Sequence, residues 1–241
     1  MPLPPPSAPL FVSPLRSLWL AVALSMGAAI SLGITRFAYA LLLPPMREDL
    51  GWSYTLAGGM NTVNALGYLL GALATPLLLR RVAPGTVLVA GAVMATVFMG
   101  LSGFFTQAAP LLVQRLLAGG ASALVFIAGG LLAARLGAQV PGRSGLLLGL
   151  YYGGTGWGIS LSALLVPAVL GVAPAPHSWT WAWWVLALAC VAAAVAARNA
   201  RIRRERARRR RRRGQRPSQR SGSGGQRRGS GNAVQRRKKM L

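Results

Sequence analysis

The sequence predicts an all-helical, polytopic membrane protein, with a bundle of six apolar helices followed by a disordered basic tail. Of its 241 residues, 53% are hydrophobic and only 12% are charged, whereas soluble domains carry about 25% charged residues. Six stretches are long enough to cross about 30 Å of hydrocarbon, and none of them contains an acidic residue. The charge is also divided, since 19 of the 27 Lys and Arg residues lie between Arg198 and Lys239.

The chain begins with a proline-rich segment, residues 1–16, which we expect to be cytoplasmic. The apolar run that follows extends over 17–43. A secretory signal has an apolar core of roughly 7–15 residues, so this run is too long for one and is predicted to be a retained first span.

The six predicted spans together form a transmembrane domain over 17–197, with proline- or glycine-containing joints between them. We place the joints at Pro44-Pro45, Pro84-Gly85, Pro110, Pro141-Gly142 and Pro174 with Pro176. The spans are 17–43, 54–79, 83–105, 109–134, 144–170 and 179–197.

The distribution of arginine predicts the orientation of the bundle. With the amino terminus in the cytoplasm, the inner segments hold five arginines and the outer loops hold Arg47 alone. We therefore expect both termini inside, in a bacterial inner membrane. Four tryptophans lie near the start of the sixth span (Trp179, Trp181, Trp183 and Trp184). Such clustering is typical of the membrane–water interface, here on the outer side of the inner membrane.

Residues 198–241 are rich in Arg, Gly and Ser. Such a segment has too little apolar surface to offset its ordering entropy, so we predict that it is disordered. One hypothesis is that it binds nucleic acid or anionic lipid without sequence specificity. The other is that it is arbitrary sequence from a shifted reading frame.

Two arginines fall inside predicted spans. Arg36 lies seven residues from the outer end of the first span, and Arg115 lies six residues into the fourth. Both are therefore expected roughly 10 Å below the outer surface. Because intramembrane charge is costly, we interpret the two as an anion-binding pair facing one cavity. The alternatives are that each snorkels to the headgroups, or that Arg36 pairs with Glu48 or Asp49.

Polar and aromatic side chains mark two further spans. Asn61, Asn64 and Tyr68 share one helical face of the second span, where they either contact a solute or form interhelical hydrogen bonds. In the fifth span, Tyr152 is a cavity candidate, although an aromatic in a membrane helix more often serves packing.

Glycine pairs four residues apart are assigned to close helix packing. These pairs are Gly67 with Gly71, Gly149 with Gly153, and Gly154 with Gly158.

No catalytic pattern is evident in the sequence. The single histidine, His177, and the single cysteine, Cys190, do not suggest a zinc site or a catalytic pair. The stretch GGTGWG has no strand before it, and no nucleotide-binding loop of the GxxxxGK type is present. We therefore expect a non-enzyme without metal or cofactor.

Three stretches resemble the YbfB/YjiJ-like branch of the major facilitator superfamily. They are GITRFAYALLLPPMREDLGWSYTLAGGMNTVNALGYLLGAL (33–73), LLVQRLLAGGASA (111–123) and PGRSGLLLGLYYGGTGWGISLS (141–162). The likeness covers about residues 16–197.

The resemblance implies one six-helix half of a twelve-span transporter that binds a small solute between its halves and alternates access. It also implies that Arg36 and Arg115 line the cavity, with Arg115 at the position of a motif arginine often linked to proton coupling. The aspartate that the family carries in the loop between spans 2 and 3 is missing here, although Arg80 and Arg81 remain.

Because the chain holds only six spans, we expect a truncated or frameshifted amino-terminal bundle. It would transport a small, anionic solute only as a homodimer or with a separately encoded second half. The alternative function is a membrane-anchored protein whose tail binds polyanions.

Overall fold

A computed structural model describes residues 14–140, 142–173, 176–193, 195 and 199. The predictions for the proline-rich start and for the basic tail therefore concern residues that lie outside the described part, apart from 14–16 and 199. Every described element is helical. The helices are α1 (Pro14–Ala28), the π-helical η1 (Ala29–Ile34), α2 (Thr35–Asp49), α3 (Tyr54–Arg81), α4 (Pro84–Ser102), α5 (Ala108–Gly137), α6 (Ser144–Leu170) and an apolar helix at Ser178–Ala193.

The predicted all-helical fold class is confirmed. Within the described residues, five helical stretches are long and apolar enough to cross a membrane, the first of which, Leu15–Asp49, comprises α1, η1 and α2. α6 coincides with the predicted span 144–170, and α3, α4 and α5 differ from their predictions by a few residues at either end. The Ser178–Ala193 helix covers most of the predicted span 179–197, of which residues 194, 196 and 197 lie outside the described part.

The first span is longer than predicted, because α1, η1 and α2 follow one another without a break. The predicted joint at Pro44-Pro45 is wrong, since both prolines lie inside α2. Proline fixes φ at a helical value, so its main cost is the missing N–H. The carbonyls of Ala40 and Leu41 therefore receive no hydrogen bond from residues 44 and 45. Both residues are exposed, and both lie near the end of the helix.

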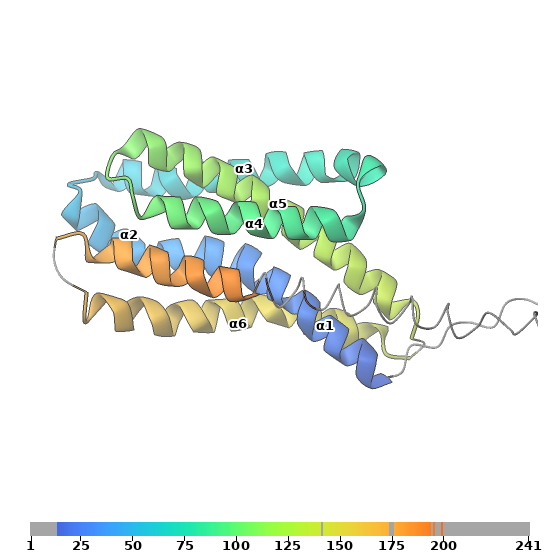
Figure 1. The fold of residues 1–241 in the computed structure, drawn as a ribbon. Coiled ribbons are helices and arrows are strands. Elements are labelled where there is room, and N and C mark those ends of the chain that lie inside the picture. The colour runs from blue at the N-terminus through green and yellow to red at the C-terminus, as the bar shows by residue number, and fades with distance from the viewer. Residues whose placement is uncertain (1–13, 141, 174–175, 194, 196–198, 200–241) are drawn as a thin grey trace, which may run out of the picture. The chain divides into compact units, whose positions relative to one another are not determined.

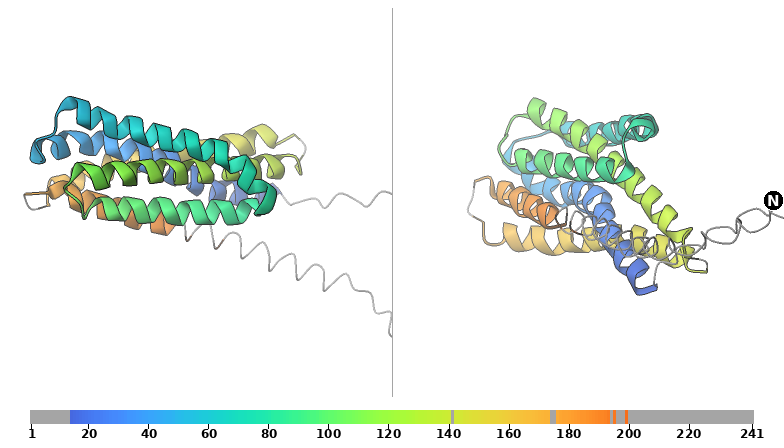
Figure 2. Two further views of the ribbon diagram at one scale, coloured as in Figure 1. Left: turned by 90° about the horizontal axis from the view of Figure 1, so that it is seen from above. Right: turned by 45° about the vertical axis from the view of Figure 1, so that its right-hand side comes forward.

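The helices lie alongside one another and alternate in direction (Figures 1 and 2). The links from α2 to α3 and from α4 to α5 lie at one end of the bundle, and those from α3 to α4 and from α5 to α6 lie at the other. α5 packs extensively on both α3 and α4, while α6 packs mainly on α1 and η1. α5 is therefore the central helix of one group, and α6 belongs to a second.

Close backbone contact joins α3 to α5. A Cβ atom on Gly67 would collide with the carbonyl oxygen of Leu116, and one on Gly71 would lie 2.6 Å from that of Gly120. Glycine at these positions lets the two helices approach closely enough for direct backbone contact.

α6 uses one of its two glycine pairs in the same way. A Cβ on Gly154 would collide with the Ser25 carbonyl, and one on Gly158 would lie 2.5 Å from that of Ala29. Gly149 and Gly153, by contrast, would place a Cβ with nothing within 4 Å among the described residues. The two pairs lie on different faces of α6, and within the described residues only Gly154 and Gly158 meet α1 and η1, so packing at Gly149 and Gly153 stays a prediction.

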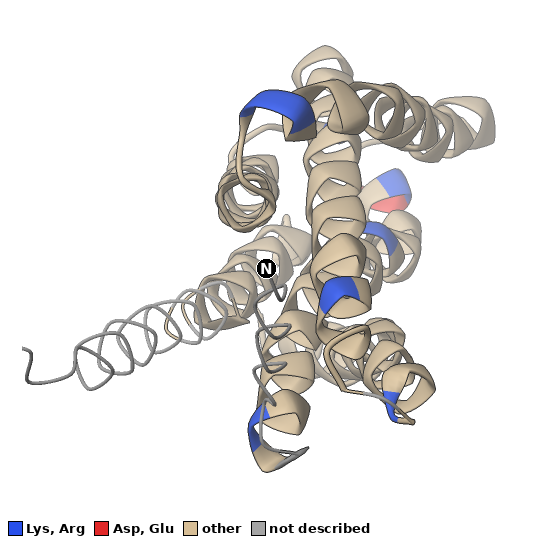
Figure 3. Ribbon diagram, turned by 90° about the vertical axis from the view of Figure 1, so that its right-hand side faces the viewer, with Lys and Arg blue, Asp and Glu red and all other residues tan. Residues whose placement is uncertain are grey.

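Basic residues gather at one end of the bundle. These are Arg16, Arg80, Arg81, Arg135 and Arg143, each in or next to a terminal turn at that end. Figure 3 looks from this end and shows most of the basic segments on the near helix ends, while the acidic segment lies farther back beside another basic one.

The tryptophans after α6 are only partly an interface cluster. Trp179 and Trp183 are buried, whereas Trp181 is about half exposed. Cys190 is buried on the same helix, where its thiol lies 3.8 Å from the sulfur of Met99 on α4. This helix is therefore held in the bundle by large side chains on one face.

Candidate functional site

Arg115 lies inside the bundle, where its side chain is only 3% exposed. The guanidinium carbon lies 4.2 Å from the centre of the Tyr39 ring and 5.9 Å from that of Trp183. Nη1 donates a weak hydrogen bond of 3.4 Å to the Thr35 carbonyl. Aromatic faces attract cations by about 0.5–2 kcal/mol, so Tyr39 and Trp183 partly offset the cost of burying this charge.

No carboxylate neutralises Arg115 within the described residues. Their only acidic side chains are Glu48 and Asp49, and Asp49 is bound elsewhere. Nε and Nη2 of Arg115 also have no hydrogen-bond partner in this part of the chain. A buried and unpaired charge is costly to retain, which favours a functional reason for its presence.

A π-helical segment shapes the first span beside Arg115. Both the backbone N–H and the side-chain hydroxyl of Thr35 donate to the Ile30 carbonyl, the hydroxyl at 2.6 Å. Such segments are rare and frequently occur at functional sites. The apolar pattern of this segment carries no signal for a π-helix, although Gly33 and Thr35 are compatible with a distorted turn.

Asn64 forms a hydrogen bond between two helices and does not face a cavity within the described residues. Its amide nitrogen donates to the Arg115 carbonyl at 2.8 Å, and the residue is buried where α3 meets α5. Of the two roles considered for Asn64, solute contact and interhelical hydrogen bonding, the contact present is the interhelical hydrogen bond.

The two intramembrane arginines face different surroundings. Arg115 contacts the carbonyl of Thr35, the residue before Arg36, so the two arginines lie at similar levels along the bundle. Arg36 nevertheless is exposed, while Arg115 is buried. Successive helical residues point about 100° apart, so Thr35 and Tyr39 meet Arg115 while Arg36 turns away. The expected single surface holding both guanidinium groups is therefore not what the structure contains.

Arg36 instead belongs to an exposed face made by α2, α3 and α6. Its charge lies within electrostatic reach of the Tyr68 hydroxyl, which also interacts with Tyr152. Asn61 is exposed on the same side of α3 as Tyr68, seven residues and two turns away. We call Arg36, Asn61, Tyr68 and Tyr152 the polar face.

Two aromatic rings, those of Tyr151 and Phe126, pack against Tyr152 of the polar face. Tyr151 is buried and donates to the Phe126 carbonyl at 2.7 Å, and its ring centre lies 5.1 Å from that of Tyr152. The ring of Phe126 on α5 lies 5.7 Å from that of Tyr152 and 6.0 Å from that of Tyr151, so the three rings form one cluster. Tyr152 is thus fixed by two rings and still 50% exposed, so it presents a rigid aromatic surface.

A separate polar cluster, formed by Asp49, His177 and Trp179, lies at the end of the bundle opposite to the clustered arginines. The Asp49 carboxylate contacts Nδ1 of His177 and accepts a 2.6 Å hydrogen bond from Nε1 of Trp179. The alternative in which Arg36 pairs with Asp49 therefore does not hold.

The described residues contain no group of three or more His, Cys, Asp or Glu side chains that would hold a metal ion. A family model described as the uncharacterised MFS-type transporter YbfB matches residues 28–225. The chain belongs to this YbfB-type family of the major facilitator superfamily. No curated protein matches it.

Membership of the YbfB-type family places the chain among transporters and not among enzymes. Together with five long apolar helices, it identifies a multi-pass membrane protein in contact with a lipid bilayer. The matched range begins just before η1 and includes Arg115 and every residue of the polar face. It also extends beyond the range of the resemblance found in the sequence, which ended at about 197.

Proposed function

We propose that the described helices form one half of a secondary transporter of major facilitator type, and that the polar face lines its solute cavity. The observation that carries this proposal is the exposed charge of Arg36, which interacts with Tyr68, while Tyr68 in turn interacts with the half-exposed Tyr152. A surface facing only lipid would be expected to be apolar throughout, because exposing charge to hydrocarbon is costly.

The helices differ in how much of their surface is buried, and this difference supports a second helical unit packed against the polar face. Only 17% of the most apolar stretch of α3 and 22% of that of α6 are buried, against 61% for the first span. α3 and α6 both carry members of the polar face. A second six-helix unit covering them would enclose a cavity between two halves, as alternating access requires. That unit is a further part of the same polypeptide, a separate chain or a second copy.

The chemistry of the polar face indicates the class of solute. Arg36 offers a cation with several donors, Asn61 an amide, and the two tyrosines offer ring faces and hydroxyls. We infer a small organic anion with an apolar or aromatic portion. Arg115, buried behind Tyr39, acts on the position of α2 rather than by touching the solute.

Ligand-dependent stabilisation tests the solute class. A panel of aliphatic and aromatic carboxylates is added to the purified full chain, and thermal unfolding is followed in detergent. A ligand at 100 times its Kd raises stability by about 2.7 kcal/mol, so a bound carboxylate gives a clear shift.

We expect a member of the panel to shift the wild type and Arg143→Gln equally and to leave Arg36→Gln unchanged. Arg143 is a suitable control because it is an exposed arginine at the end of α6 and outside the polar face. An equal shift in Arg36→Gln, or no shift with any carboxylate, would contradict the anionic class.

A further inference from the structure

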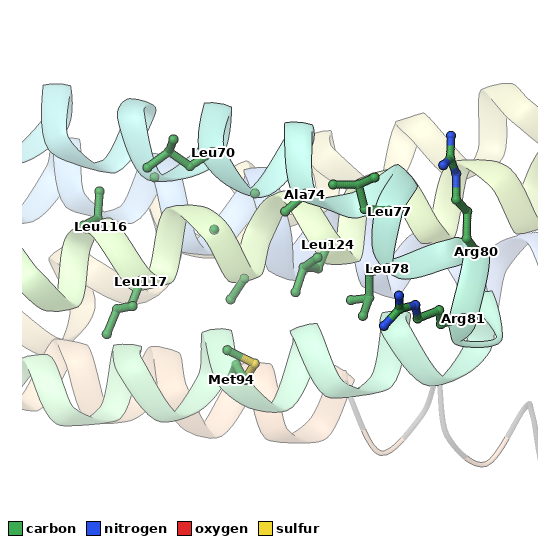
Figure 4. A pocket seen from close by; sticks show the side chains of 14 residues that line it. Leu70, Ala74, Leu77, Leu78, Arg80, Arg81, Met94, Leu116, Leu117 and Leu124 are labelled. Atoms are coloured by element: carbon green, nitrogen blue, oxygen red, sulfur yellow. The ribbon is translucent and has the colours of Figure 1, made fainter.

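A long apolar groove runs along the side of the bundle between α3, α4 and α5. Its volume is about 850 Å³, and apolar side chains such as Leu70, Leu77, Met94 and Leu117 form most of its lining. Figure 4 shows these side chains arranged along the groove and Arg80 and Arg81 together at one end. The groove is thus apolar along its length and basic at one end.

The two arginines have no carboxylate partner among the described residues, where the one ion pair joins His177 to Asp49. Both are exposed in the last turn of α3. α4 begins three residues after Arg81, and no side chain caps its amino terminus, whose N–H groups carry a partial positive charge. The carbonyl end of α3 offsets the partial positive charge of the α4 amino terminus, so the two guanidinium groups dominate the potential at this end of the groove.

The lining and the charge of the groove favour a lipid as its occupant. An acyl chain is narrow and apolar and matches the leucine lining, and a phosphate at its head would meet the arginines.

We propose that this groove binds an anionic glycerophospholipid of the adjacent leaflet, with its phosphate at Arg80 and Arg81 and an acyl chain along α3 and α5. Basic pockets between membrane helices bind acidic headgroups in this manner, and each basic residue near the surface contributes roughly a fivefold preference. This site is separate from the polar face and does not depend on the solute.

Photocrosslinking from inside the groove tests the proposal. The full chain carries p-benzoylphenylalanine at Leu77, which is exposed within the groove, and is reconstituted in phosphatidylcholine vesicles. The vesicles contain trace radiolabelled phosphatidylglycerol or, in a parallel sample, radiolabelled phosphatidylcholine. The same probe at Leu146, an exposed leucine in the first turn of α6, reports ordinary lipid contact.

We expect phosphatidylglycerol to crosslink at Leu77 at least roughly fivefold more than phosphatidylcholine, with a much smaller ratio at Leu146. Arg80→Gln with Arg81→Gln removes the preference. Arg135→Gln with Arg143→Gln removes the same number of charges from the same end of the bundle and leaves the preference intact. The basic tail is present in every sample and so does not create these differences.

Three results would overturn the proposal. One is an equal preference in the Arg80/Arg81 double variant, and another is an equal preference at Leu77 and Leu146. The third is a protein–protein crosslink in place of a lipid adduct at Leu77, which would assign the groove to a second copy of the chain.

Discussion

The Tyr39 ring lies against the Arg115 guanidinium at 4.2 Å, and the Tyr39 hydroxyl donates to the Ala57 carbonyl at 3.0 Å. One side chain of α2 thus joins α5 to the first turn of α3. It does so beside the buried charge, so both contacts are expected to affect the stability of the bundle.

Substitutions at Tyr39 separate the two contacts. Tyr39→Phe loses the hydrogen bond to Ala57 and should lower the free energy of unfolding by about 1 kcal/mol. Tyr39→Leu also loses the aromatic face over Arg115, and should cost about 0.5–2 kcal/mol more. Denaturant unfolding in detergent measures both, and equal effects of the two variants would show that the cation–π contact contributes nothing.

The contact between α3 and α5 gives a sharper prediction. Gly67→Ala places a methyl group against the Leu116 carbonyl and forces the helices apart, so we expect a loss of about 3 kcal/mol or more. Gly149→Ala is the matched control, because open space surrounds that position and alanine favours helix by about 1 kcal/mol. If both substitutions leave the thermal midpoint unchanged, α3 and α5 do not pack as described.

The spans could be predicted from the sequence because crossing hydrocarbon requires length and apolar composition, both of which are visible in single stretches. The joint predicted at Pro44-Pro45 is wrong, since proline ends a helix only when the lost hydrogen bonds and its ring cannot be accommodated. Local composition does not reveal that accommodation.

The candidate site was only partly predictable. The sequence identified Arg36, Tyr68 and Tyr152 as polar or aromatic residues in membrane helices, but it could not give the rotation of each helix about its axis. That rotation separates Arg36 from Arg115, and it depends on η1 and on contacts with α5. The Asp49–His177 contact joins residues 128 apart and has no local signal.

The Asp49 cluster predicts a pH dependence of stability. The Asp49 carboxylate contacts His177 and accepts a hydrogen bond from Trp179. Protonation of the carboxylate weakens both contacts, so the folded state is expected to lose stability in acid.

Thermal unfolding of the wild type at pH 6, 4 and 3 should therefore show a decline that is smaller in Asp49→Asn. Glu48→Gln, which removes the neighbouring charge, serves as the comparison. A decline in Asp49→Asn as steep as in the wild type would assign the acid sensitivity to other groups.

The clustered arginines predict the orientation in the membrane. Under the positive-inside rule, the end that holds Arg16, Arg80, Arg81, Arg135 and Arg143 faces the cytoplasm. In a Cys190→Ala background, a cysteine at Ser53 should react with an impermeant maleimide in intact cells, and one at Thr86 only after lysis. The reverse pattern would contradict the orientation.

Water, and not lipid, is expected to reach the polar face, and thiol accessibility tests this expectation most directly. Tyr152→Cys and Leu164→Cys both lie on α6 in the Cys190→Ala background, and Leu164 is the more exposed of the two at 72% against 50%. A thiol reacts as its thiolate, which does not form in hydrocarbon. Membranes containing each variant are treated with a charged, impermeant methanethiosulfonate. We predict rapid labelling at position 152 and almost none at 164, despite the greater exposure of 164 in the isolated bundle. Equal reactivity at the two positions, or labelling at 164 alone, would contradict a solute cavity at this face.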